Sequence, residues 1–201
     1  MPRIRASTVV AHRELMWTRL LDAFGELLAD KGYAAMTLAE VATRAGMARN
    51  TIYNYAPDKE ALLMAYIGRA VEQFVGESRS QLAELDDARE RLSWLILKQM
   101  HQFRAETGGG PDNGMLEGNT LGPAAHVDLQ LRFQPLHTLM SEIVSEGIAS
   151  GEFRSDVVAD EVVPLVLAVI GSERLPVGAR QHPPEQAAAR VTTFVLRALT
   201  D

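Results

Sequence analysis

The sequence of 201 residues has no cysteine, few aromatic residues (6%) and no long uncharged apolar run. Without cysteine there is no disulfide framework, no thiolate nucleophile and no cysteine zinc site. The best candidate for a membrane span, residues 162–172, is far shorter than the about 20 residues that a spanning helix needs. The amino-terminal segment has no apolar run ahead of a small-residue cleavage site, so no secretory signal is expected. We therefore expect a cytoplasmic protein with no membrane partner.

Sequence motifs for catalysis and metal binding are also missing. The chain contains no HExxH motif, no histidine pair at helical spacing, no Gly-x-Ser-x-Gly elbow and no P-loop. We therefore expect no catalytic residues, no metal site and no cofactor.

The net charge of -6 is unevenly distributed. Residues 1–60 hold 8 Lys+Arg against 7 Asp+Glu, and the remainder holds 12 against 19. Phosphate affinity depends on local charge rather than on total charge. Arg3, Arg5, Arg13 and Arg19 stand against the single acid Glu14 in the first 20 residues, so the amino end is a candidate basic arm. Arg3 and Arg5 are suited to a minor groove, with a disordered terminus as the alternative.

Apolar residues recur at spacings of three and four throughout the chain, which predicts an all-α protein. Glycine and other turn formers dominate residues 107–123, which are therefore predicted to form a long loop, and residues 174–185 are predicted to be a turn-rich connection. The predicted helices cover about residues 17–31, 38–45, 48–55, 59–74, 87–106, 136–150, 161–174 and 187–198.

Two of the predicted helices are short and are separated by a glycine turn. Thr37 and Glu40 have the spacing of a capping box, so a helix begins at Leu38, and Gly46 ends it after about two turns. Residues 48–55 follow and have more polar than apolar side chains, unlike a buried helix. Because the major groove admits one helix, this arrangement indicates a helix-turn-helix that reads DNA. A helical hairpin within an ordinary bundle is the alternative.

Residues 31–63 read KGYAAMTLAEVATRAGMARNTIYNYAPDKEALL. This segment resembles the amino-terminal hallmark of the TetR family of transcriptional regulators, and the match covers about residues 15–70. The resemblance implies a three-helix DNA-binding domain at residues 1–57, with the basic arm. It also implies a larger helical domain at residues 58–201 that binds a ligand and forms a dimer, and repression that a small molecule relieves.

The same resemblance assigns roles in DNA binding. Arg49 and Asn50 are predicted to contact base edges or phosphates, since arginine pairs with guanine and asparagine with adenine at about 1–3 kcal/mol each. Thr51 resembles the family's phosphate-contacting hydroxyl, and Tyr53 and Lys59 its backbone anchors. A core phenol is the alternative for Tyr53, and a solvated lysine is the alternative for Lys59. The predicted interface also includes Thr37, Asn54 and Tyr55.

Three positions depart from the family pattern. Ala48 replaces a capping hydroxyl worth about 1 kcal/mol. Asn50 projects a side chain where glycine is usual, so the operator should differ from those of typical members. Ala56 replaces a phenylalanine, and Tyr55 or Tyr66 is expected to supply the missing packing.

The larger domain contains candidate effector contacts on its inward helical stripes. They are aromatic, soft or polar side chains, and plain core packing is the alternative for each of them. His101 and His137 are the preferred polar contacts, because histidine is rarely a core residue without a partner. The loop at residues 107–123 is predicted to gate this pocket. The candidates are Trp94, Met100, His101, Phe103, Phe133, His137 and Met140.

Helices at about residues 160–174 and 185–200 are predicted to form a homodimer interface. The predicted protein is a dimeric repressor that binds a palindromic double-stranded DNA operator and is released by a small-molecule effector. Two alternatives stay open: an activator or corepressor-dependent regulator, and a helical ligand-binding or enzymatic protein with a vestigial helix-turn-helix.

Overall fold

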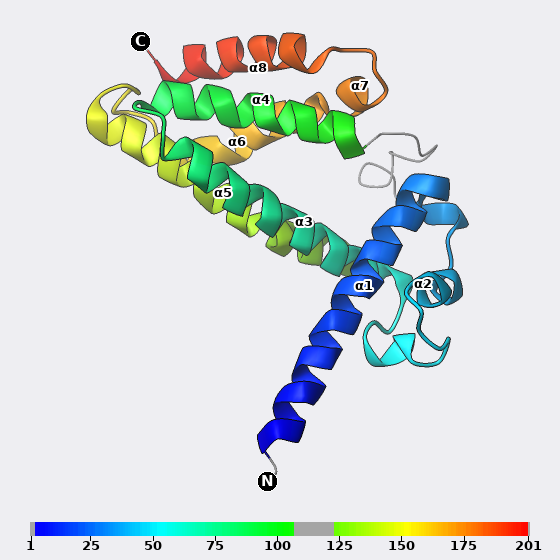
Figure 1. The fold of residues 1–201 in the computed structure, drawn as a ribbon. Helices are drawn as coiled ribbons and strands as arrows, with labels where there is room; N and C mark the ends of the chain where they lie inside the picture. The colour runs from blue at the N-terminus through cyan, green and yellow to red at the C-terminus, as the bar shows by residue number, and fades with distance from the viewer. Residues whose placement is uncertain (1–2, 107–122, 201) are drawn as a thin grey trace. The chain divides into compact units, whose positions relative to one another are not determined.

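The computed structural model describes residues 3–106 and 123–200 and contains no strand in these ranges, which confirms the all-α prediction (Figure 1). No helix in the described ranges is long and apolar enough to cross a membrane. The predicted loop at 107–123 lies outside the described residues, apart from Pro123, where a helix begins. The helices are α1 (Arg3–Ala35), α2 (Leu38–Arg44), η1 (Ile52–Asn54), α3 (Lys59–Leu82), α4 (Ala88–Glu106), α5 (Pro123–Ser150), α6 (Ala159–Ser172), α7 (Arg174–Gly178) and α8 (Pro184–Leu199).

The chain forms two compact units. The first comprises the chain up to Arg69 together with the start of α5 as far as Leu129, and the second comprises the rest. The division falls inside α3, after Arg69, whereas the sequence-based domains divide after residue 57. Within the second unit, α4 packs against α7 and α8, and α6 contacts both α7 and α8.

Several helix bounds differ from those predicted. Helix α1 begins at Arg3 rather than near Trp17, because no glycine or proline interrupts residues 3–24. The segment predicted to be a basic arm is therefore helical. Helix α5 begins at Pro123 rather than near residue 136, and the short helix α7 lies inside the predicted connection at 174–185.

Side-chain caps mark the starts of three helices, and the first of them is the predicted capping box. The Thr37 hydroxyl accepts a hydrogen bond from Glu40 N, and the Glu40 carboxylate accepts one from Thr37 N, so the capping box is complete. The Asp58 carboxylate accepts from Ala61 N at 2.7 Å at the start of α3. The Asp87 carboxylate accepts from Glu90 N at 2.6 Å at the start of α4.

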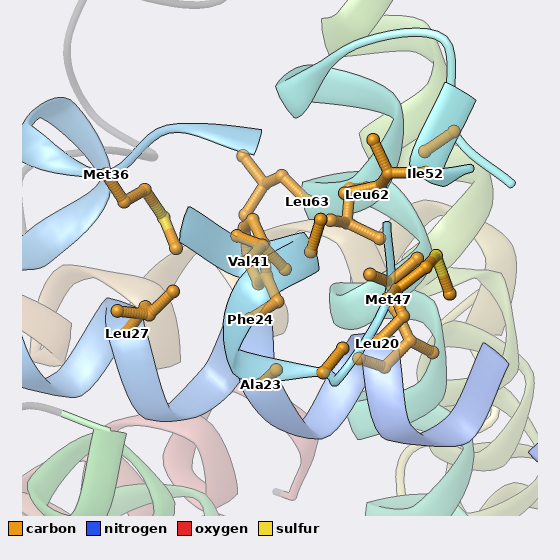
Figure 2. Packing of buried hydrophobic residues seen from close by; sticks show 14 of the residues in the cluster. Leu20, Ala23, Phe24, Leu27, Met36, Val41, Met47, Ile52, Leu62 and Leu63 are labelled. Carbon is orange, nitrogen blue, oxygen red and sulfur yellow. The ribbon is translucent and has the colours of Figure 1, made fainter. Parts of the chain in front are cut away.

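The first unit has a core to which α1, α2, η1 and α3 all contribute (Figure 2). Phe24 and Leu20 of α1 are fully buried, and Val41 of α2 and Leu62 of α3 point toward them. Ile52 of η1 is also fully buried. The turn between α2 and α3 is therefore held by the same core that joins the longer helices.

Candidate nucleic-acid interface

Residues 46–56 form a series of tight turns between α2 and α3. Gly46 has φ 68°, a conformation that favours glycine, and it ends α2 as predicted. Thr51 N donates to Ala48 O at 2.8 Å, and Tyr55 N donates to Ile52 O at 2.9 Å. The prediction of a short α-helix over residues 48–55 is thus wrong in detail, because the only helical element there is η1, a single 3-10 turn.

The shortness of η1 has a physical explanation. The residue before η1, Thr51, makes no capping hydrogen bond with its side chain, and Pro57 disfavours helical backbone at Ala56. Only a few residues remain for a helix, and so short a segment does not offset the cost of nucleation. The turn therefore depends on its buried side chains rather than on helical hydrogen bonding.

The turns have a buried face and an exposed polar face. Ile52 and Ala56 are buried, whereas Thr51 and Tyr55 are half-buried. The exposed side chain of Tyr53 excludes the alternative of a core phenol, since 57% of the residue is accessible. Four of the predicted DNA contacts therefore share an exposed segment: Arg49, Asn50, Tyr53 and Asn54.

Tyr55 connects this segment to α1. Its ring stacks on Trp17 with centroids 6.2 Å apart and planes 11° apart, and the Arg13 guanidinium lies 5.9 Å from the Tyr55 ring centroid. Tyr66 packs on Phe24 at 5.4 Å. Tyr55 thus supplies packing next to Ala56, as the sequence predicts. The stack with Trp17 and Arg13 was not predicted, since sequence spacing does not relate α1 to residue 55.

The Lys59 ammonium group binds within the first unit. Its Nζ donates to Tyr33 O at 2.8 Å and to Met36 O at 3.2 Å, and it lies 4.1 Å from the Tyr33 ring centroid. Burial lowers the pKa of Lys59. The alternative of a solvated lysine is wrong, because the ammonium group satisfies carbonyls at the end of α1.

Most cations near the exposed segment are paired within the chain. Arg44 forms ion pairs with Glu26 at 3.0 Å and with Asp30 at 3.3 Å. Arg49, by contrast, makes no ion pair with any described residue and is exposed. Arg49 is therefore the cation of the 37–59 segment that is available to a phosphate or a base edge.

Thr37 and Glu40 form a pH-sensitive cap next to this segment. A hydrogen bond from Lys31, together with those from Thr37, lowers the pKa of Glu40 from 4.5 to about 2. Because the folded-state pKa is lower than the unfolded value, the carboxylate stabilises the fold above pH 4.5. We expect this contribution to disappear as the pH falls from 4.5 to about 2.

Thermal unfolding of the unchanged protein and of Glu40→Gln, measured at pH 7 and at several points down to pH 2, checks this expectation. The difference in Tm between the two proteins should be present at pH 7 and should shrink toward pH 2. A difference that stays constant over this range would contradict the assigned pKa shift.

The predicted effector residues of the second unit have different environments. Met100 and Met140 are fully buried, whereas His101 is exposed and its Nε2 lies 3.5 Å from Glu185 Oε1. His101 therefore faces α8 and solvent rather than the interior, which is a correction to its predicted placement. The four remaining candidates are half-buried: Trp94, Phe103, Phe133 and His137.

Sequence reasoning missed one polar residue of the second unit, Gln99, which is 5% exposed. Its burial could have been predicted from its spacing, since Gln99 lies three residues after Ile96 and four after Leu95, on the apolar stripe of α4. Within the described ranges, no group of three or more histidine, aspartate or glutamate side chains is placed to hold a metal ion.

The chain is similar to known bacterial regulatory proteins. Residues 20–66 match the bacterial regulatory proteins of the tetR family. The Bacillus subtilis fatty acid metabolism regulator protein is 25% identical over 142 residues, which cover 69% of this chain and 71% of that protein. The fold is similar to that of the fatty acid degradation regulator FadR from Bacillus halodurans, with a TM-score of 0.76, 20% identity and coverage of 90% and 94%. FadR from Bacillus subtilis, solved with stearoyl-CoA, has a TM-score of 0.74 at 20% identity and coverage of 90% and 97%.

The fold and the exposed turn between α2 and α3 define a helix-turn-helix DNA-binding regulator. Residues 20–66 form a domain of the tetR family of bacterial regulatory proteins, and the comparisons support a TetR family transcriptional regulator.

Proposed function

We propose that this protein is a homodimeric repressor that binds a palindromic operator and is released by a long-chain acyl thioester. The observation that carries the DNA-binding part is the two-sided turn at residues 46–56. Ile52 anchors its inner side, while Arg49, Asn50 and Tyr53 lie on its exposed side. An unpaired arginine beside an exposed asparagine suits direct readout of guanine and adenine.

Some of the predicted contact residues are proposed to touch DNA, and others to hold the interface in shape. Arg49 and Asn50 read base edges or phosphates, and Tyr53 contacts the DNA backbone. Lys59 acts mainly by holding the end of α1, because its ammonium group already binds two carbonyls. Thr37 likewise caps α2 with its hydroxyl, so its contribution to DNA binding is mainly structural.

Replacing Arg49 with alanine tests the DNA-binding proposal. The operator is first selected from random DNA with the unchanged protein, and affinity is then measured by fluorescence anisotropy at several salt concentrations. We expect Arg49→Ala to weaken binding by about 1–3 kcal/mol, and to reduce the salt dependence if the contact is to a phosphate.

Arg44→Ala is the matched control, since Arg44 is held by Glu26 and Asp30 and should change affinity less. Binding by the unchanged protein that is weak and indifferent to sequence would contradict the proposal. Adding stearoyl-CoA to the complex should release the DNA. Tighter DNA binding with stearoyl-CoA would instead identify a corepressor-dependent regulator.

The proposed dimer forms through α6 and α8. Each helix has a buried face toward the second unit and also exposes a large apolar side chain, Leu165 at 65% and Phe194 at 60%. Phe194 lies in an open groove along α8, which is also lined by Ala189, Arg190, Thr193 and Arg197. A second copy of these helices would remove this apolar surface from water. The exposed turns at residues 46–56 of the two protomers would then contact half-sites about 34 Å apart or somewhat more.

Replacing Phe194 with glutamate tests this interface. A charge at its centre should convert the dimer into a monomer and thereby weaken operator binding, since both half-sites could no longer be bound by one dimer. Sedimentation velocity measures the change. Gln81→Glu, which introduces the same charge at an exposed position of α3, should leave the assembly unchanged. A Phe194→Glu protein that stays dimeric would place the interface elsewhere.

The effector proposal combines the relatives with the chemistry of the second unit. A similar regulator is named for fatty acid metabolism, and FadR of the same fold holds stearoyl-CoA. The interior of the second unit is built from aliphatic side chains and methionines, which suit an acyl chain, among them Leu95, Met100 and Met140. A ligand that binds better when the two exposed turns of the dimer are spaced wrongly for DNA would shift the dimer population away from the state that binds the operator.

A further inference from the structure

Two polar residues are buried in the described part of the second unit, and only one of them is satisfied. The hydroxyl of Ser78, which is fully buried, donates to Phe74 O at 2.6 Å within α3. The side-chain nitrogen Nε2 of Gln99 is buried and has no hydrogen-bond partner among the described residues. Native proteins rarely leave a buried donor unpaired, so Gln99 requires an explanation.

Gln99 occupies a position where α4 otherwise has aliphatic side chains. Leu92, Leu95 and Ile96, at seven, four and three residues before it, are each fully buried. These spacings place all four residues on one face of α4, which packs against α7 and α8 (Figure 1). A leucine or methionine would fill this position without an unpaired donor. The amide therefore weakens the fold, unless its donor is used in another state of the protein.

We propose that Gln99 Nε2 donates a hydrogen bond to the carbonyl oxygen of an acyl effector bound inside the second unit. This inference rests on the proposed function and assigns the polar contact that the aliphatic interior otherwise lacks. An amide nitrogen is a neutral donor, so it suits an acceptor oxygen in the apolar part of a ligand. A fatty acyl thioester has one such oxygen at the head of its chain.

Lys98, the neighbour of Gln99 in the sequence, is not available to balance a free carboxylate. Lys98 Nζ lies 5.2 Å from the ring centroids of both Phe74 and Trp94 and pairs with Glu77 at 3.3 Å. Its charge is therefore already engaged on α3 and α4. A carboxylate buried beside Gln99 would need a compensating cation, whereas a thioester carbonyl needs only a hydrogen-bond donor.

The first expected result concerns the protein without effector. Gln99→Met keeps the length of the side chain and removes the unpaired donor, so Tm should rise by about 2–4 °C. Gln134→Met is the matched control, because Gln134 is exposed on α5 and the same substitution there should leave Tm nearly unchanged. A fall in Tm for Gln99→Met would show that the amide already supports the fold, and would overturn the proposal.

The second expected result concerns binding, measured by titration calorimetry on the full chain with two probes. Stearoyl-CoA has the thioester carbonyl, and S-octadecyl-CoA has a methylene group in its place. The unchanged protein should bind stearoyl-CoA about tenfold more tightly, since about 1.4 kcal/mol for one desolvated hydrogen bond is a factor of ten. Gln99→Met should bind the two probes about equally, and Gln134→Met should keep the preference.

The outcomes separate this proposal from the proposed function. Release of DNA by stearoyl-CoA with a tenfold preference that survives in Gln99→Met would overturn the role of Gln99 and leave the acyl effector standing. Equal binding of both probes by the unchanged protein would do the same. No binding of either probe would overturn the acyl effector, and the role of Gln99 with it.

Discussion

Replacing Ile52 with alanine should lower the free energy of unfolding of the first unit by about 2–5 kcal/mol, the cost of deleting most of a fully buried aliphatic side chain. Ile52 is the first residue of η1 and belongs to the core cluster of α1, α2 and α3 (Figure 2). Because η1 has so few hydrogen bonds of its own, the loss should loosen the exposed segment that contains Arg49 and Tyr53.

The measurement is chemical denaturation followed by tryptophan fluorescence. The chain has two tryptophans, Trp17 in the first unit and Trp94 in the second, so a Trp94→Phe background reports the first unit alone. Tyr53→Ala is the matched control. Its side chain is exposed, so stability should stay within about 0.5 kcal/mol while operator affinity falls. An Ile52→Ala protein as stable as its parent would show that the core does not anchor the turn.

Replacing Gly147 with alanine should destabilise the second unit by about 1–3 kcal/mol. An added Cβ would lie 2.9 Å from the Cβ of Ala88 and would overlap the ring of Phe153. The ring is buried and has little freedom to withdraw, because Phe153 N donates to Gly147 O at 2.9 Å. The same region also caps α4, since the Glu152 carboxylate accepts from Ala88 N at 2.9 Å. Crowding at Gly147 should therefore disturb the start of α4 as well as the end of α5.

Gly76→Ala is the control, and it should raise stability where Gly147→Ala lowers it. Gly76 lies in α3, is exposed, and an added Cβ there would meet no atom within 4 Å. Alanine at this helical position should raise the stability by about 0.5–1 kcal/mol. Denaturation in a Trp17→Phe background, in which Trp94 reports the second unit, measures both variants. Equal stabilities of the Gly147→Ala and Gly76→Ala proteins would contradict the close contact predicted for a Cβ at residue 147.

The two variants at residues 52 and 53 also test what holds the exposed DNA-binding segment in place. In a longer recognition helix, backbone hydrogen bonds would fix the exposed side chains independently of any one core residue. Here one buried isoleucine and the stack of Tyr55 on Trp17 hold the segment. The orientation of Arg49 and Asn50 therefore depends on packing against α1, so changes in α1 should alter DNA affinity without contacting DNA.

Local signals in the sequence predicted much of the first unit. Thr37 with Glu40, and Asp58, mark the starts of α2 and α3, because a cap needs only a side-chain oxygen and an amide three residues later. Gly46 marks the end of α2 for a similarly local reason. The length of the segment after Gly46 was less predictable. Hydrophobic pattern alone does not distinguish a short α-helix from a 3-10 turn that is held by one buried residue.

Pairings across the fold were beyond sequence reasoning. Lys59 has the spacing of a family backbone anchor, and its ammonium group binds carbonyls at the end of α1. His101 has the position of an inward residue, yet it faces Glu185 on α8. Both outcomes depend on which groups from distant parts of the chain come within hydrogen-bonding distance, and no periodicity contains that information.

The sequence by itself determined that this protein is all-helical, where α2 and α3 begin, and that it resembles the TetR family, because these properties rest on local spacing and capping. Only the tertiary structure decided which polar groups are free to act. Among the described residues, Arg49 has no ion pair while Arg44 and Lys59 are engaged, and the buried Nε2 of Gln99 has no hydrogen-bond partner. The physical reason is that the availability of a charge or donor depends on its neighbours in space, which packing between helices sets.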